Sequence, residues 1–509
     1  MESRSGHGRQ GGPSPPRRSP NPKPQSYIND GVDRISGLPD HLLEEILRRI
    51  RCARSAARTS LLSRRWRHGL WRDLPELSFR GIAAEALPVA LTQVARPDLS
   101  LLDIHTISCF EVAGITSLLR AAARLAPAEL VVSADLLESW GGEHFIPFKL
   151  QLPCFHRANS ITLELRHHIP QLQVTGGEFP VLERLSLVNC PVHSISDLIS
   201  RAPRLRSLQL CHRLYYTTCP GKIMVHSTTL EELLLDRWEL FGGIDIVAPA
   251  LRTFTLTSSR LLGIHVVAPE LKMFTLSARI VSNHPRITLS AAATVEYLSW
   301  TCSFPMTPLI HGVWCLRELK LGEKKDAYVL SLTLDGERTA EQPRNLQEVV
   351  QFPRVSVLEL YLHTFWPEAH VYGPMVLDLM GIFADIKRLK LVIRDLKLEK
   401  ACLPNCTCAQ PQNWRSQSIS LIALEVVEIE NFIGSSHEVD FLKLVFRSAP
   451  MMKRVAVKQC SHTVPSFRAC KEICNLFRGH PSVKCYSYDS CGKKVLYPLS
   501  TYASRCRGR

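Results

Sequence analysis

The sequence predicts a mixed α/β protein in which a small three-helix module is followed by a long solenoid of repeats. Apolar residues in the segment 33–79 recur at steps of three and four, which is the spacing of one helical face. From residue 158 onward, triplets of apolar residues return every 20 to 25 residues, a period typical of solenoid repeats. Because one such unit cannot bury its strand alone, stacked units are expected to share a core beneath a parallel sheet on the concave face of the solenoid.

Residues 1–32 are predicted to form a disordered tail. They contain five glycines, six prolines and five serines, with almost no apolar residues. Such a segment cannot bury enough apolar surface to offset the entropy that it would lose on ordering.

The segment 33–79 opens with a predicted amphipathic helix. Pro39 suits its first turn, where a missing N–H costs nothing, and Arg48 and Arg49 complement the helix dipole at its end. Two further apolar runs, 53–62 and 66–71, predict two more short helices. Three helices of this size close little core, so we expect the module to expose apolar surface that a partner covers.

The apolar residues of this module belong to a longer motif. It reads Leu38-Pro39-x-x-Leu42-Leu43-x-x-Ile46-Leu47, then Thr59-x-x-Leu62-Ser63-Arg64-Arg65-Trp66-Arg67-x-x-x-Trp71. This motif resembles the F-box of plant F-box proteins, and the resemblance implies a docking module for a Skp-type adaptor and, through it, a cullin in a ubiquitin ligase. The alternative is a plain three-helix bundle whose apolar residues pack only on one another. The adaptor contacts that the resemblance implies are Leu38, Pro39, Leu42, Ile46, Leu47, Leu62, Ser63, Trp66 and Trp71.

Residues 80–157 are predicted to hold a linker with an N-terminal cap or irregular repeats. Leu99, Leu102 and Ile104 already have the spacing of the repeat that follows. Residues 115–125 have the pattern of an amphipathic helix, and a strand is expected to begin at about Glu129.

The repeat consists of an apolar anchor, two residues, a second anchor, one residue and a third anchor. The first seven triplets are spaced 23, 25, 21, 20, 24 and 21 residues apart, inside the range of leucine-rich repeats. Residues 243–257 and 263–277 are identical at nine of fifteen positions, so the periodicity is a true internal repeat. We therefore assign residues 158–440 to an irregular leucine-rich-repeat solenoid. The anchors are Leu182/Leu185/Leu187, Leu205/Leu208/Leu210, Leu230/Leu233/Leu235, Leu251/Phe254/Leu256, Leu271/Phe274/Leu276, Val295/Leu298/Trp300, Leu316/Leu319/Leu321, Val355/Leu358/Leu360, Ile386/Leu389/Leu391, Leu424/Val427/Ile429 and Met452/Val455/Val457.

The later repeats are longer and end in a separate module. Their spacing predicts inserted loops at residues 335–345 and 402–418. Residues 441–500 resemble the FBD module that closes many plant F-box/leucine-rich-repeat proteins, and this module is expected to cap the last strand of the solenoid with a helix.

Outward-facing strand residues predict where a protein substrate binds. Side chains alternate along a strand, so the residues between the anchors face the concave surface. The central repeats place small neutral residues there, whereas later strands carry alternate charged bands that begin with Arg388 and Lys390, Glu428 and Glu430, and Arg454 and Lys458. These bands either orient a partner or pair with one another. The predicted substrate-binding residues are Thr253, Thr255, Met273, Thr275, Tyr297 and Ser299.

The sequence offers no pattern for catalysis, a cofactor or a metal. Cys406-x-Cys408 is too tight for a pair of zinc ligands, and neither Cys402 nor a second pair completes a site. Phosphate-binding glycine loops, metalloprotease helices and nucleophile elbows are missing from the sequence. The 17 scattered cysteines, with no signal peptide or membrane span in the sequence, predict reduced thiols in the nucleus or the cytoplasm.

Charge leaves two readings of function open. The net charge is +15, and the segment 34–72 carries ten arginines against three acidic residues, so it fits an acidic adaptor as well as nucleic acid. The resemblance implies a non-catalytic substrate receptor that binds an adaptor and an unknown protein substrate. The alternatives are a basic nucleic-acid-binding solenoid and an F-box protein that acts outside a ligase. The basic runs 64–67 and 505–509 could bind nucleic acid, but they lack aromatic interleaving of the sort used for base stacking.

Overall fold

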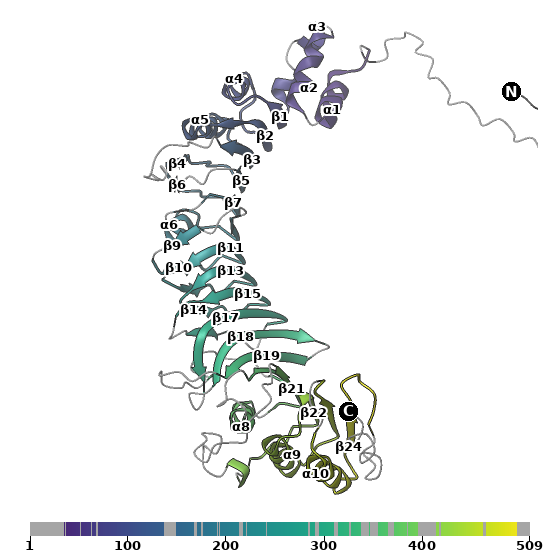
Figure 1. Cartoon of the computed structure of the whole chain (residues 1–509). Coiled ribbons are helices and arrows are strands. Elements are labelled where there is room, and N and C mark those ends of the chain that lie inside the picture. The colour runs from purple at the N-terminus through teal and green to yellow at the C-terminus, as the bar shows by residue number, and fades with distance from the viewer. Residues whose placement is uncertain are drawn as a thin grey trace, which may run out of the picture.

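The protein forms an elongated arc with a helical module at its N-terminal end (Figure 1). The computed structural model describes residues 35, 37–50, 52–62, 64–67, 70–136, 149–166, 171–174, 177–190, 192, 194–212, 217–219, 221–240, 242–282, 286–290, 295–309, 314–324, 327–336, 346, 355–364, 371–383, 385–394, 414–416, 419–461 and 465–495. The predicted tail, the Cys402 to Cys408 group and the basic run 505–509 lie outside these residues.

The helical module contains three short α-helices and two 3-10 turns. Acidic Asp40 opens the first helix and two arginines close it, as the dipole favours. The second helix ends at Arg58 and the third begins at Arg64, so the predicted runs 53–62 and 66–71 form separate helical elements. The elements are α1 (Asp40–Ile50), α2 (Ala53–Arg58), η1 (Thr59–Leu61), α3 (Arg64–Arg67) and η2 (Leu70–Asp73).

One long sheet lines the inner side of the arc. Within the described residues it holds 18 strands, most of them parallel to their neighbours. It begins at β1, directly after the helical module, and the predicted strands near Leu99 and Glu129 are confirmed as β2 and β3. The strands are β1 (Glu76–Ile82), β2 (Leu101–Phe110), β3 (Glu129–Leu136), β5 (Ser160–Arg166), β7 (Arg184–Val188), β8 (Ser207–Cys211), β9 (Thr217–Cys219), β11 (Glu232–Leu240), β13 (Thr253–Leu261), β15 (Met273–Ile280), β17 (Tyr297–Leu309), β18 (Trp314–Lys324), β19 (Ala327–Gly336), β20 (Val357–His363), β21 (Arg388–Arg394), β22 (Val426–Phe432), β23 (Arg454–Gln459) and β24 (Lys484–Tyr488).

The outer side of the arc is covered by helices at both ends and by a second sheet in the middle (Figure 1). The second sheet stacks four short parallel strands. Its turns are tight: Gly243 has φ +75°, and a Cβ there would lie 2.8 Å from the carbonyl oxygen of Gly263. The covering elements are α4 (Ala86–Thr92), α5 (Val112–Ala123), β4 (Lys149–Leu152), β6 (Gln171–Val174), α6 (Ile195–Ser200), β10 (Ile223–His226), β12 (Ile244–Val247), β14 (Ile264–Val267), β16 (Ile287–Ser290), α8 (Gly373–Ile382), α9 (Ser436–Ser448) and α10 (Phe467–Arg478).

The predicted anchors form the core between the two layers. All eleven triplets are buried, which confirms them as inward-facing residues. Phe254 and Phe274 hold equivalent positions in paired strands, and their ring centroids lie 5.7 Å apart. Trp300 extends this ladder, with 5.9 Å between its ring and that of Phe274. A row of tilted aromatic rings in contact therefore joins three successive repeats.

One predicted repeat runs in the opposite direction. The triplet Leu316/Leu319/Leu321 was expected on a parallel strand, but β18 is antiparallel to both β17 and β19. The physical reason is chain length, because only four residues separate Leu309 from Trp314, whereas a parallel crossover needs about a dozen. The sequence analysis also missed β19, whose alternation of Leu330, Leu332 and Leu334 is a strand signal.

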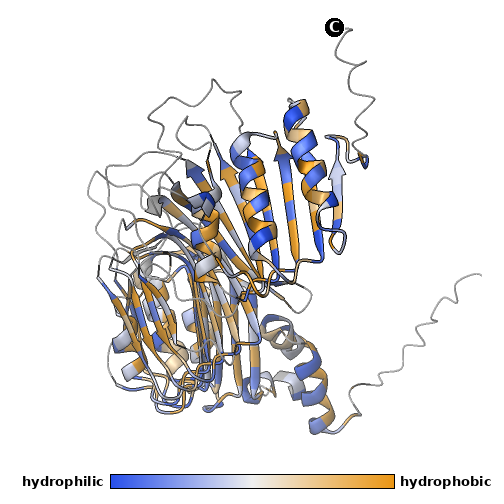
Figure 2. Cartoon of the chain, turned by 90° about the horizontal axis from the view of Figure 1, so that it is seen from below, coloured by the Kyte–Doolittle hydropathy of each residue, from blue (hydrophilic) through white to orange (hydrophobic). Residues whose placement is uncertain are grey.

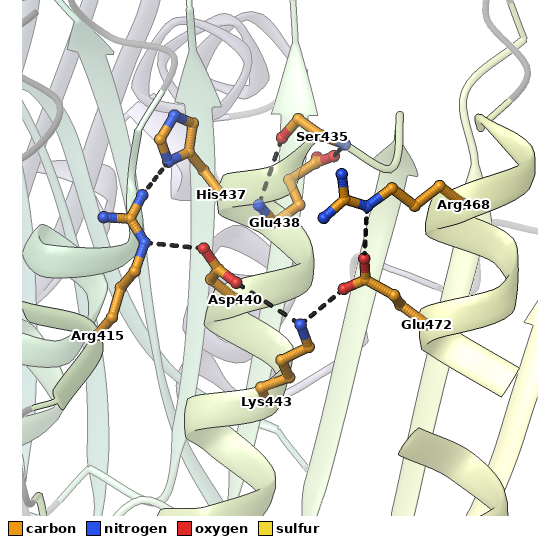
Figure 3. A network of polar contacts seen from close by, with 8 residues as sticks. All are labelled: Arg415, Ser435, His437, Glu438, Asp440, Lys443, Arg468 and Glu472. Atoms are coloured by element: carbon orange, nitrogen blue, oxygen red, sulfur yellow. Dashed lines mark hydrogen bonds and ion pairs between the residues drawn. The ribbon is translucent and has the colours of Figure 1, made fainter. Parts of the chain in front are cut away.

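The C-terminal end adds two helices to the outer side of the sheet. α9 and α10 each precede a strand, and Figure 2 shows both lying over the sheet with alternating apolar and polar stripes. An ion pair joins their exposed sides, because Lys443 of α9 lies 2.6 Å from Glu472 of α10, and a second pair ties α9 to the 3-10 turn Trp414–Ser416, where Arg415 lies 2.7 Å from Asp440 (Figure 3). The predicted cap is thus a pair of helices with β24 as the last strand.

A capping box begins α9. The Ser435 hydroxyl accepts a hydrogen bond from the Glu438 backbone N–H, and the Glu438 carboxylate accepts one from the Ser435 N–H at 2.9 Å (Figure 3). The Glu438 side chain is buried, and this burial raises its pKa from 4.5 to about 7 despite the hydrogen bonds that favour the charged form. Ionising this carboxyl therefore opposes folding.

We expect Phe254→Ala to lower the free energy of unfolding by about 3–5 kcal/mol, because it opens a cavity inside the aromatic ladder. Thr255→Ala, at the adjacent outward-facing position, should change it by about 1 kcal/mol or less. Equal denaturant midpoints for Phe254→Ala and the parent protein would contradict the ladder.

The raised pKa of Glu438 predicts a pH-dependent stability. A glutamate whose folded pKa exceeds its unfolded pKa stabilises the fold below about pH 4.5, and this contribution is lost as the pH rises through about 7. Glutamine keeps the cap but cannot ionise, so Glu438→Gln should gain up to about 3 kcal/mol relative to the parent between pH 4.5 and 8. Thermal melting at several pH values measures the difference, and parallel curves for the two proteins would refute it.

Candidate docking surfaces

The interior of the helical module is closed by its own residues. Leu43 and Leu47 of α1 are buried together with Trp66 and Trp71 from the later helical turns. Arg65 on α3 ties back to Asp40 on α1 at 2.7 Å, which fixes the angle between these helices. Three of the residues assigned to adaptor contact by the resemblance, Leu47, Trp66 and Trp71, therefore pack inside the module and can shape a docking surface only indirectly.

Several large apolar side chains of the module remain exposed. Leu61 and Leu62 are 79% and 68% exposed, and Leu42 is 41% exposed. Pro39 is also exposed, whereas Leu38 and Ile46 are half-buried against the core. Ser63 lies outside the described residues. We call Leu42, Leu61 and Leu62 the leucine face. Exposed leucines gathered on one small module mark a protein contact surface.

Leu61 is a residue that the sequence analysis missed. The resemblance assigned only Leu62, although the adjacent pair Leu61-Leu62 ends an apolar run. In the structure the chain turns through η1 at this point, so both side chains face solvent. Adjacent residues of a helix lie about 100° apart and can both be exposed, so the helical pattern of the sequence does not decide whether Leu61 faces solvent.

A second surface lies on the inner face of the sheet, at β13, β15 and β17. Met273 pairs with Thr253 on one side and Tyr297 on the other, and Thr275 lies in the next row between Thr255 and Ser299. Met273 is 43% exposed and Tyr297 is 50% exposed. The structure thus brings all six predicted residues into one neutral patch, which we call the central patch. Two large apolar side chains surrounded by hydroxyls suit a protein contact.

The charged bands on the later strands pair with one another. Arg388 lies 2.7 Å from Glu428, and Lys390 lies 2.9 Å from Glu430. The hydrogen bond from Lys390 to Glu430 raises the pKa of that lysine above its usual value. Arg454 completes the row at 3.8 Å from Glu428. This confirms mutual pairing, the second of the two roles considered for these residues, and leaves Lys458 outside the pairs.

Three buried ionisable groups inside the solenoid are held in their uncharged forms. Burial raises the pKa of the Cys190 thiol well above its usual range and that of Cys302 to about 12, so both stay protonated. Burial lowers the pKa of His212 to about 4, which keeps its ring neutral beside Trp238. Among the described residues, no three His, Cys, Asp or Glu side chains gather as a metal site would require. Within that same part of the chain, none of the helices combines the length and apolarity needed to cross a bilayer.

A compact helical module with an exposed leucine face, joined to a parallel leucine-rich-repeat solenoid, defines an F-box/leucine-rich-repeat protein. The curated proteins that are similar to the chain agree with this class. No protein-family profile matches the chain, and no solved structure matches it.

Several curated proteins of Arabidopsis thaliana are similar to the chain. F-box/LRR-repeat protein At5g02910 is 30% identical over 243 residues, which cover 46% of this chain and 50% of the relative. F-box/LRR-repeat protein 25 is 28% identical over 241 residues, or 88% of its length. Putative F-box protein At2g39415 is 34% identical over 85 residues, or 70% of its length. The match spans about half the length of the first of these relatives. The chain belongs to the plant F-box/leucine-rich-repeat proteins.

The leucine face should contribute little to the stability of the module. We expect Leu61→Ala with Leu62→Ala to change the free energy of opening by no more than about 0.5 kcal/mol per residue, because both side chains are exposed. Leu47→Ala should cost about 2–5 kcal/mol. Hydrogen exchange of the α1 amides measures this opening locally. Fast exchange in the double mutant would mean that these leucines pack inside the module.

Proposed function

We propose that the protein is the substrate-recognition subunit of a Skp-cullin-F-box ubiquitin ligase. The observation that carries the proposal is the leucine face, which stays exposed although the interior of the module is already closed. Leucines in this position gain free energy only when a second protein removes them from water. Membership of the F-box/leucine-rich-repeat family supports a Skp-type adaptor as that protein.

In this proposal the solenoid holds the substrate and performs no bond chemistry itself. The leucine face lies on the helical module, and the central patch lies on the long sheet that begins directly after this module. A rigid arc that binds adaptor at one end and substrate on its inner face raises the effective concentration of a substrate lysine near the ubiquitin-conjugating enzyme.

Binding to a recombinant plant Skp-type adaptor tests the docking half of the proposal. Because interface energy is concentrated in a few desolvated side chains, we expect Leu61→Ala with Leu62→Ala to weaken binding by at least about a hundredfold, measured by calorimetry. Leu38→Ala with Pro39→Ala tests the positions that the resemblance assigns. Val89→Ala with Ile422→Ala is the matched control, since both residues are exposed and apolar but lie elsewhere. Adaptor binding at parental affinity by both F-box mutants would refute the assignment.

The central patch is proposed as the floor of the substrate site. Met273→Ala with Tyr297→Ala should remove most captured proteins from a quantitative affinity purification, because the two largest exposed apolar contacts of the patch are lost, while adaptor binding remains. Thr257→Ala with Ser277→Ala is the control on the same strands. An unchanged set of captured proteins would place the substrate site elsewhere. Retention on nucleic acid that weakens with salt, without adaptor, would favour the nucleic-acid-binding alternative.

A further inference from the structure

The last two strands of the sheet present cations and tyrosines together on the inner face. β23 and β24 pair in register, so that Arg454 lies beside Lys484 and Lys458 lies beside Tyr488. Between them the small residue Ala456 lies beside Tyr486. The rings of Tyr486 and Tyr488 are stacked with centroids 6.2 Å apart. We call Arg454, Lys458, Lys484, Tyr486 and Tyr488, together with Lys494, the basic tyrosine surface.

The positive charge of this surface is less compensated than that of the preceding strands. On β21, Arg388 and Lys390 each have a carboxylate within 2.9 Å. On β23, the one carboxylate near Arg454 within the described residues is that of Glu428, at 3.8 Å, and Arg388 already holds that glutamate at 2.7 Å. Among the described residues, Lys458 and Lys484 have no acidic partner. A row of cations whose counter-charges are missing attracts a partner that supplies carboxylates or phosphates.

The tyrosines determine which kind of anion fits. The Arg454 guanidinium lies 5.5 Å from the centroid of the Tyr486 ring, and the Lys494 ammonium lies 4.7 Å from it. A nucleic acid would need this ring free for a base to stack upon, and two cations already lie over it. An acidic peptide needs only the ammonium and guanidinium groups and the tyrosine hydroxyls, all of which remain able to donate hydrogen bonds.

We infer that the basic tyrosine surface binds an extended acidic segment of the protein substrate. It forms a second subsite on the face that carries the central patch, and it rests on the proposed function only in taking that face as the partner surface. Glutamates, aspartates or phosphorylated residues four apart in the segment would meet Arg454 or Lys484 and then Lys458, because Lys458 lies four residues along β23 from Arg454 and residues at even spacings of an extended strand face the same way.

The test uses the full-length protein and two fluorescent probes. One is a peptide of about twelve alternating glutamates and serines, and the other is an oligothymidylate of about the same length. At about 50 mM NaCl, where surface charges are weakly screened, we expect the peptide to bind and Lys458→Glu with Lys484→Glu to weaken it by about tenfold. Arg124→Glu with Lys471→Glu changes the net charge equally at exposed sites elsewhere and should have less than about a twofold effect.

Three results would overturn the inference. Equal loss in the two charge-reversal variants would mean that only net charge matters. Tighter binding of the oligothymidylate, competitive with the peptide and lost in Lys458→Glu with Lys484→Glu, would make the surface a nucleic-acid site. If neither probe bound, the lysines would be explained instead as charges that protect an edge strand against aggregation. Neither adaptor nor cullin is present in this assay, so a failed adaptor experiment and a failed peptide experiment are separate outcomes.

Discussion

Each repeat of the solenoid buries its apolar side chains only with the help of the neighbouring repeats, and the rest of the structure follows from that constraint. A single strand such as β13 buries Phe254 and Leu256 because β11 and β15 flank it in register and the second sheet lies behind it. A slip of one residue would turn these side chains to the solvent and bring Thr253 and Thr255 inward. The register that protects the core thus also aligns the neutral residues of the central patch in two adjacent rows.

The fold was largely predictable because the anchors repeat. A triplet such as Leu205/Leu208/Leu210 indicates which side chains face the core. The spacing between triplets indicates how far along the chain the next strand begins. The spacing alone does not indicate whether a strand runs parallel or antiparallel to its neighbours, so the orientation of β18 was predicted wrongly. The length of the connection before Trp314 carries that information, since four residues permit a hairpin and exclude a crossover. The second sheet was also missed, although Ile244, Ile264 and their neighbours alternate as strands do.

The candidate surfaces were less predictable, because exposure depends on local turns and on partners across the sheet. The motif that resembles an F-box predicts the helical module. It does not indicate that Leu62 faces solvent and that Trp66 is buried. Leu62 directly follows the 3-10 turn η1, whereas Trp66 lies on α3, whose packing against the rest of the module buries it. Similarly, the sequence shows that Arg388 and Glu428 carry opposite charges on successive strands. Only the register of β21 and β22 shows that the two side chains form an ion pair.

The antiparallel segment β17–β18–β19 has a consequence for how the chain folds. Its strands are joined by short links, so they can meet without closing a long loop, whereas each parallel pair such as β5 and β7 must first bring together residues about twenty or more positions apart. The entropy of loop closure therefore favours this segment as the place where the sheet starts, after which repeats add outward in both directions. Transition-state φ-values near one at Leu319 and near zero at Leu163 are the signature of that order. An interruption of the repeat pattern would then be the nucleus on which the regular repeats assemble.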